Sequence, residues 1–263
     1  MHGTLALLVG LFVGGFANIW IYRLPRDLSV VRLQSFCPAC NWALPWYDTM
    51  PIVSFALLGG RCRNCREAIP PRYPIVELLT GCMFLAAWQR FGYSSAGFRT
   101  DVFLFLVIVA VFADIEERIL PDETTLVGLL LALISSPFAL MRPGLGGRLF
   151  SLLHMRPSDP MASFTESFVG GLALAGTLYA FSSLYQIMTR EENLGLGDVK
   201  LAAMIGAWMG STYSLVIYLM GVVLMALFIS FYWLASNKTL SQPYELPYSA
   251  FVGIIAIIAA VYW

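Results

Sequence analysis

The chain has 263 residues, of which 59% are hydrophobic and 12% are charged, and its formal net charge is +0. Because a soluble globular domain carries about 25% charged residues, this composition excludes an ordinary soluble domain. It indicates a protein that crosses a membrane several times. The balanced charge gives no reason to expect nucleic acid or an acidic polymer as a partner.

Long apolar segments recur along the whole chain. A membrane-spanning helix needs roughly 20 mostly apolar residues, so we predict an all-α polytopic membrane protein with about eight transmembrane helices. The sixth segment is short, and its boundary with the seventh lies near Gly210, so seven spans is the alternative. The expected spans are residues 4–22, 74–91, 102–120, 124–141, 163–188, 199–208, 211–235 and 246–263.

The first expected span contains two glycines four residues apart, Gly10 and Gly14. This pattern of small residues lets two helices approach closely inside a membrane. Asn18, on the same span, can form a hydrogen bond to a neighbouring helix. We interpret these residues as helix-packing positions and assign them no catalytic role.

The segment that follows, residues 23–73, carries two Cys-x-x-Cys pairs separated by 21 residues. Cysteines two residues apart can both reach one tetrahedral ion, and two such pairs are typical of a zinc site. The segment has few aliphatic residues, so a metal would supply its folding energy. Redox dithiols or disulfides are the alternative. The four expected ligands of this structural zinc site are Cys37, Cys40, Cys62 and Cys65.

The basic residues predict which side of the membrane this segment faces. If the N-terminus lies outside, the inward segments hold eleven of the 16 Lys and Arg residues. Lys and Arg are enriched in cytoplasmic loops, so we expect the cysteine segment to face the cytoplasm. We therefore divide the chain into a first transmembrane helix at residues 1–22, a cytoplasmic zinc-binding domain at 23–74 and a transmembrane core at 75–263.

Two aspartates lie beside apolar segments where a carboxyl group is costly. Asp114 follows twelve uninterrupted apolar residues, and Asp198 stands in Gly-Leu-Gly-Asp at residues 195–198, before another apolar segment. An ionisable residue in or beside a membrane span is a functional-site hypothesis. Pro121 should end the helix that carries Asp114, and Asp122 should cap the next helix. The alternative is a purely structural role, in which residues 195–198 form a flexible turn and Asp198 caps the following helix.

Both aspartates are predicted at the cytoplasmic face, which allows them to act as a pair. Two carboxyl groups about 3 Å apart share one proton. One can then activate water while the other donates to a carbonyl oxygen, which hydrolyses a peptide bond without a covalent intermediate. A Ser-His-Asp arrangement is not expected, because the two histidines, His2 and His154, are placed outside.

These residues, taken together, make the chain resemble a known family over nearly the whole length of the chain. It is similar to the bacterial type IV prepilin peptidases, which are leader peptidases and N-methyltransferases of pilus and type II secretion systems. The Gly-x-Gly-Asp motif is shared with presenilin-like intramembrane aspartyl proteases. The matching segments, in order, are GLFVGGFANIWIYRLP at 10–25, the cysteine segment at 37–77, Asp114 with Leu-Pro-Asp at 120–122, and GLGDVK at 195–200.

The resemblance implies roles that the residue patterns alone do not give. It implies that Asp114 and Asp198 are the catalytic pair of a transmembrane aspartyl protease core, at residues 75–263. It implies S-adenosylmethionine as methyl donor, with Gly60 and Arg61 as cofactor-binding residues. The family usually has lysine where Arg61 stands. Its last part usually contains a Pro-Phe-Gly-Pro-like segment, for which residues 244–248 here are a poor match.

The same resemblance predicts partners and location. The substrates would be prepilins or pseudopilins with a short basic leader, and the protein would lie in the bacterial inner membrane, with no nucleic acid bound. The sequence does not specify an oligomeric state. We expect an acidic rim to attract the basic leader to the aspartate pair. The rim consists of the acids of the inward segments around the pair, which are Asp114, Glu116, Glu117, Asp122, Glu123, Glu191, Glu192 and Asp198.

Two other classes of function are alternatives for this sequence. A proton-coupled transporter would use buried carboxylates as a relay, near the middle of the membrane and often in repeated halves. A zinc-bearing membrane scaffold would perform no chemistry, and it would leave Asp114 unexplained.

Overall fold

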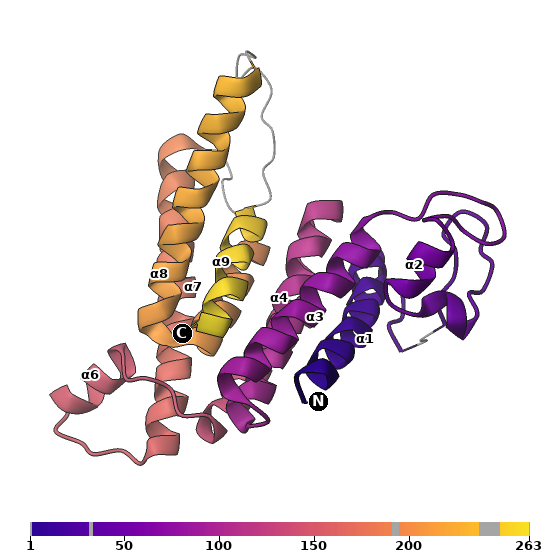
Figure 1. Ribbon diagram of the computed structural model, residues 1–263. Helices are drawn as coiled ribbons and strands as arrows, with labels where there is room; N and C mark the ends of the chain where they lie inside the picture. Colours follow the sequence, from indigo (N-terminus) through magenta and orange to yellow (C-terminus); the bar gives the residue numbers. More distant parts are fainter. Residues whose placement is uncertain (1, 32–33, 191–194, 237–247, 263) are drawn as a thin grey trace. The chain divides into compact units, whose positions relative to one another are not determined.

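The computed structural model describes residues 2–31, 34–190, 195–236 and 248–262, and it is helical throughout these ranges apart from connecting loops (Figure 1). In the described part of the chain, β-type backbone pairing is limited to two isolated bridges, Phe36 with Ala43 and Arg61 with Ala68. The helices are α1 (His2–Arg23), α2 (Val53–Leu57), α3 (Arg72–Phe91), α4 (Ser95–Glu117), α5 (Asp122–Ser135), α6 (Leu145–Leu152), α7 (Asp159–Thr189), α8 (Leu196–Ser236) and α9 (Tyr248–Tyr262), with short 3-10 turns at Leu24–Arg26, Trp46–Thr49 and Ser136–Phe138.

Four helical segments among the described residues are long and apolar enough to cross a membrane. They match the predicted first, third and fifth spans, and the predicted sixth and seventh joined in α8. Gly210 interrupts α8 with a φ of 76°, at the predicted boundary. Helices α3, α5 and α9 occupy the segments predicted as the second, fourth and eighth spans. The four segments are His2–Arg26, Ser95–Glu117, Asp159–Met188 and Leu196–Tyr232.

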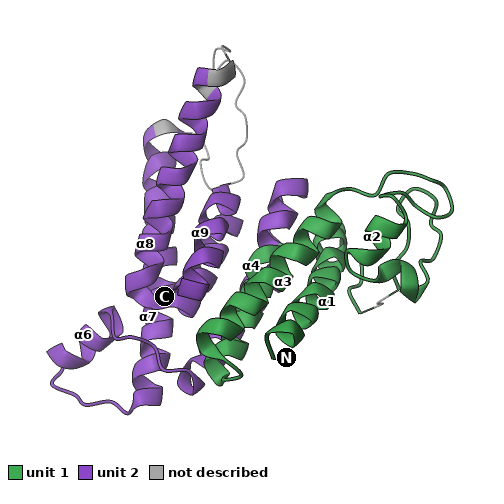
Figure 2. Ribbon diagram, viewed as in Figure 1, with its two compact units in different colours: residues 1–109 green, residues 110–263 purple. Residues whose placement is uncertain are grey.

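The chain forms two compact units, residues 1–109 and 110–263, and the boundary falls within α4 (Figure 2). In the first unit, α1 packs directly on α3. A Cβ atom at Gly14 would lie 2.6 Å from the Cα of Glu77, and one at Gly10 would lie 2.8 Å from the Cα of Gly81. The two backbones therefore touch, which confirms that these glycines are helix-packing positions.

In the second unit, α7 and α8 pack equally closely. A Cβ atom at Gly170 would lie 2.4 Å from the carbonyl oxygen of Gly206, and the Ser167 hydroxyl donates to the Ala207 carbonyl at 2.7 Å. Helix α5 joins α8 through the Trp208 indole N–H, which donates to the Gly128 carbonyl at 2.9 Å. Hydrogen bonds from buried side chains to backbone carbonyls thus join α7 to α8 and α8 to α5.

The break in α8 at Gly210 is held by a buried carboxylate of α7. Glu166 is 2% exposed and accepts the backbone N–H groups of Gly144 at 3.0 Å, Gly146 at 2.9 Å and Ser211 at 2.8 Å. The Ser211 hydroxyl also donates to it. Glu166 therefore satisfies the donors that the interrupted helix and the start of α6 would otherwise leave unpaired.

We predict that Glu166→Leu destabilises the protein by several kcal/mol, because each buried donor left unpaired costs about 1–3 kcal/mol. The measurement is the thermal unfolding temperature of the protein in detergent. Glu123→Leu, which removes an exposed glutamate of α5, is the matched control and should unfold near the wild-type temperature. Equal unfolding temperatures for the Glu166 variant and the wild type would contradict the role of Glu166.

Candidate active site and metal site

The two cysteine pairs fold into two similar turns. In each turn the first cysteine and the residue four positions later are joined by backbone bonds: Asn41 N–H to the Cys37 carbonyl at 2.8 Å, and Arg66 N–H to the Cys62 carbonyl at 3.0 Å. Asn41 and Arg66 both have positive φ, 55° and 63°, which closes the turn. The same local fold at both pairs directs four sulfur atoms to one point.

The four sulfur atoms fit a tetrahedral metal ion. The ligand atoms of Cys37, Cys40, Cys62 and Cys65 all lie within 4.8 Å of one another, and the Cys37 and Cys65 sulfurs are 3.8 Å apart. A zinc ion with four thiolates at about 2.3 Å requires sulfur atoms about 3.8 Å apart. All five cysteines of the chain are described, and each is a free thiol, so the disulfide alternative has no support here.

The backbone prepares one of these thiols for metal binding. The Trp42 N–H donates to Cys40 and lowers the pKa of that thiol to about 7, and the Asn64 side chain adds to the effect. Thiolates, not thiols, bind metals. The arrangement is therefore a site in which four cysteines can hold a metal ion.

Asp114 lies in the last turn of α4, and it is 9% exposed. The Ser249 hydroxyl, from α9, donates to its Oδ2 atom at 2.5 Å. Arg118 follows with a positive φ of 57°, and its N–H donates to the Asp114 carbonyl at 3.0 Å, which ends the helix there. The aspartate is thus fixed at a helix end by a neighbouring helix.

Asp198 lies in the first turn of α8, after Gly195 and Gly197. Its carboxyl group interacts electrostatically with that of Asp114. Two contacts join the same chain segments: a Cβ atom at Gly197 would lie 3.2 Å from the Cβ of Leu120, and Lys200 pairs with Asp122 at 2.7 Å. The glycine allows this approach of α8 to the segment after α4, so the two predicted aspartates stand in segments that contact each other.

Asp122 does not cap α5 as predicted. It is the first residue of α5, where Pro121 occupies the cap position, and its carboxylate accepts a hydrogen bond from Lys200. The Thr124 hydroxyl instead donates to the Pro121 carbonyl at 2.7 Å. Lys200, the lysine of the Gly-Leu-Gly-Asp-Val-Lys motif, binds the carboxylate that was expected to cap α5. Nothing in the sequence indicated this ion pair.

Sequence reasoning missed three polar side chains near the aspartates. Ser249 and Tyr248 come from α9, and Tyr218 comes from α8; the two tyrosine rings are 5.6 Å apart, and both interact electrostatically with Asp198. The hydroxyl of Tyr248 is buried without a hydrogen-bond partner among the described residues. They stand in or beside long apolar segments, so no local pattern marks them.

Gly60 and Arg61, predicted from the resemblance as cofactor-binding residues, lie in the first unit. Gly60 has a φ of 67°, which L side chains rarely adopt. Its carbonyl accepts the Ile69 N–H at 2.8 Å, and Arg61 forms the isolated bridge to Ala68. Both residues therefore belong to the second cysteine turn.

The fold and these sites define a helical protein with four segments long and apolar enough to cross a membrane, a four-cysteine module and two aspartates at helix ends. Two family models match the chain: the bacterial peptidase A24 N-terminal domain at residues 8–91 and the type IV leader peptidase family at residues 102–230. The chain belongs to the type IV leader peptidase family.

Similar proteins are known in several bacteria under the name prepilin leader peptidase/N-methyltransferase. The chain is 35% identical over 212 residues to the protein of Myxococcus xanthus, and the matched stretch covers 80% of this chain and 56% of the relative. It is 32% identical over 216 residues to the protein of Klebsiella pneumoniae, covering 80% and 86%. It is 30% identical over 231 residues to that of Neisseria gonorrhoeae, covering 78% and 73%. No solved structure matches the chain significantly.

Proposed function

We propose that the chain is a membrane-embedded aspartyl peptidase that removes the basic leader from prepilins or pseudopilins and N-methylates the new N-terminus. The name of its relatives supports both activities. The observation that carries the peptidase assignment is the approach of the start of α8, which holds Asp198, to the segment that follows Asp114: a Cβ atom at Gly197 would lie 3.2 Å from the Cβ of Leu120.

In this proposal the two aspartates hydrolyse the leader bond with one shared proton. One carboxylate takes a proton from water as the water oxygen bonds to the carbonyl carbon of the leader bond, and the other, protonated, donates to the carbonyl oxygen. The first carboxyl group then passes its proton to the amine nitrogen as the carbon–nitrogen bond breaks. A hydroxyl of the tetrahedral intermediate returns a proton to the second carboxylate, which restores the shared proton. The hydrogen bond from Ser249 holds the Asp114 carboxyl in one orientation for these transfers.

The cysteine module has a structural task in this proposal. Cys37, Cys40, Cys62 and Cys65 would hold zinc, because four thiolates complete its tetrahedral shell and leave no open position for a substrate.

S-adenosylmethionine, when bound, supplies a methyl group on a positively charged sulfur. The amine nitrogen of the shortened substrate would accept this methyl group and release a proton.

The proposal places both sites at the cytoplasmic face of the bacterial inner membrane. The excess of Lys and Arg in the expected inward segments supports this orientation. Glu116 and Glu117 stand at the end of α4, three residues or fewer after Asp114, where their charge can attract a basic leader. Two further acids of the predicted rim, Glu191 and Glu192, lie outside the described residues.

The transporter alternative fits the positions of the aspartates less well. A proton relay is expected near the middle of the membrane, whereas Asp114 lies three residues before the end of α4 and Asp198 is the third residue of α8. The positions suit a site that meets a soluble peptide segment.

The proposed function predicts that the full chain, expressed with a prepilin in a bacterium that lacks its own leader peptidase, shortens the prepilin. Mass spectrometry of the product should show a new N-terminus at the end of the basic leader, heavier by one methyl group. An intact prepilin in the presence of folded, membrane-inserted protein would refute the proposal.

A further inference from the structure

The first unit contains a pocket of about 640 Å³ outside the aspartate site. This volume is within the range of about 300–1,000 Å³ that small-molecule sites usually have. Helices α1 and α3, helix α2 and both cysteine turns contribute to its wall, including Cys37 and Cys62. A pocket built on the cysteine module is independent of the carboxyl pair.

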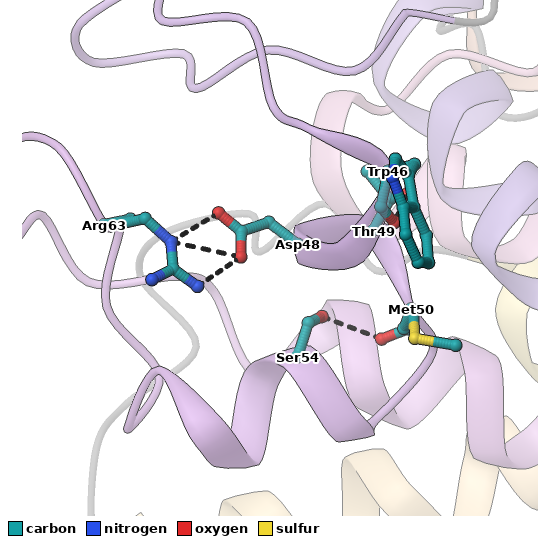
Figure 3. A network of polar contacts seen from close by, with 6 residues as sticks. All are labelled: Trp46, Asp48, Thr49, Met50, Ser54 and Arg63. Carbon is teal, nitrogen blue, oxygen red and sulfur yellow. Dashed lines mark hydrogen bonds and ion pairs between the residues drawn. The ribbon is translucent and has the colours of Figure 1, made fainter.

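The wall includes several aromatic side chains that a flat ring could contact. Phe16 comes from α1, Phe55 from α2, Tyr73 from α3, and Trp46 from the turn before α2. Asp48 and Arg63, which also line the pocket, hold this turn to the second cysteine turn. Figure 3 shows the Arg63 guanidinium against the Asp48 carboxylate, with Nη2 and Oδ1 2.7 Å apart.

One buried polar atom in the pocket wall lacks a partner. Asn18 is 2% exposed, and its Nδ2 group donates to the Tyr73 carbonyl at 3.0 Å. Its Oδ1 atom has no hydrogen-bond partner among the described residues. A buried acceptor left unpaired costs free energy, so a ligand that donates a hydrogen bond to Asn18 is favoured.

The same pocket contains a carboxylate that a cation would satisfy. Glu77 accepts the Ile52 N–H through Oε2 at 2.7 Å. Its Oε1 atom lies 3.8 Å from the position that a Cβ atom of Gly15 would take, so the glycine leaves space beside it. Glu77 and Gly15 both line the pocket.

We propose that this pocket binds the methyl donor, S-adenosylmethionine, an inference that rests on the methyltransferase part of the proposed function. Asn18 would accept a hydrogen bond from the adenine amino group, aromatic side chains would contact the ring, and Glu77 would face the positive sulfur. Aromatic surface, the unpaired acceptor of Asn18 and the carboxylate of Glu77 match an adenine nucleoside that carries a sulfonium ion, while the Asp48 carboxylate in the wall is already paired with Arg63.

This assignment also gives Gly60 and Arg61 a role, although neither lines the pocket. A Cβ atom at Gly60 would lie 3.1 Å from the Phe55 ring, which does line it, so a larger residue would push that ring. Arg61 and Gly60 hold Ala68 and Ile69, both wall residues, through backbone pairing. They are therefore positioning residues for the pocket.

The test is equilibrium binding of S-adenosylmethionine and of uncharged-sulfur S-adenosylhomocysteine to the zinc-loaded full chain in detergent, by calorimetry. The wild type should bind both. Asn18→Leu should weaken both about tenfold or more, the effect of one lost buried hydrogen bond. Glu77→Gln keeps an acceptor for Ile52 but loses the charge, so it should weaken S-adenosylmethionine selectively. Gly15→Leu should block both ligands by filling the pocket.

Two control variants should bind like the wild type. Thr80→Val removes a buried hydroxyl of α3 outside the pocket, and Asp159→Asn removes an exposed carboxylate of the second unit. If the wild type methylates and binds, but Asn18→Leu, Glu77→Gln and Gly15→Leu bind equally well, the pocket assignment is overturned and the proposed function stands. If the wild type cleaves prepilin but neither methylates nor binds, both the pocket and the methyltransferase proposal fail.

Discussion

Replacing Asp114 or Asp198 with asparagine is expected to lower the rate of leader removal by about 10³-fold, within the range for loss of a general acid or base. Asparagine keeps the size of the side chain and can still accept the Ser249 hydrogen bond, but it cannot take up or release the shared proton. The measurement is the single-turnover cleavage rate of a prepilin with purified enzyme.

The control for this prediction is Asp159→Asn, which changes an exposed carboxyl group in the first turn of α7. It should cleave at nearly the wild-type rate. Both aspartate variants should still bind S-adenosylhomocysteine, because the proposed pocket lies in the first unit. The carboxyl-pair mechanism is wrong if either aspartate variant keeps more than about a tenth of the wild-type rate while remaining folded.

Removing the metal is expected to unfold the cysteine module. Among the described residues between 24 and 71, the buried positions are Leu24, Cys37, Asp48, Pro51 and Cys62, so this part of the module has almost no apolar core. Structural zinc in such modules contributes about 10–16 kcal/mol. Limited proteolysis of chelator-treated protein should cut within residues 24–71, whereas zinc-loaded protein should resist.

Cys62→Ser should be cut in the same way without chelator, because three thiolates hold zinc less tightly than four. Cys82→Ser, which changes the exposed cysteine of α3, is the matched control and should resist like the wild type. Since Cys37 and Cys62 also line the pocket, metal removal should abolish S-adenosylhomocysteine binding. Protease resistance that does not change on removal of measured zinc would contradict the structural role.

Much of the architecture could be predicted because its signals are local. The cysteine spacing and the contact of Gly10 and Gly14 with α3 each follow from residues close together in the chain. The break near Gly210 was placed correctly for the same reason. The catalytic roles of Asp114 and Asp198 stay predictions, although the segments that carry the two aspartates contact each other.

What could not be predicted depends on residues far apart in the chain. Ser249 reaches Asp114 across 135 positions, and Glu166 meets Ser211 across 45. Lys200 takes the Asp122 carboxylate that local pattern assigned to a helix cap. The pocket around Asn18 also needs α1, α3 and the cysteine turns in place before it exists, so no single motif indicates it.

The most direct test of the central claim, that Asp114 and Asp198 meet, is a chemical cross-link within one chain. A variant with Asp114→Cys and Asp198→Cys in the membrane would be treated with a short bifunctional thiol reagent, and the linked peptides identified by mass spectrometry. We predict an intramolecular link between positions 114 and 198. If both cysteines react with a monofunctional reagent but never become linked, the two aspartates do not form a pair and the peptidase mechanism is contradicted.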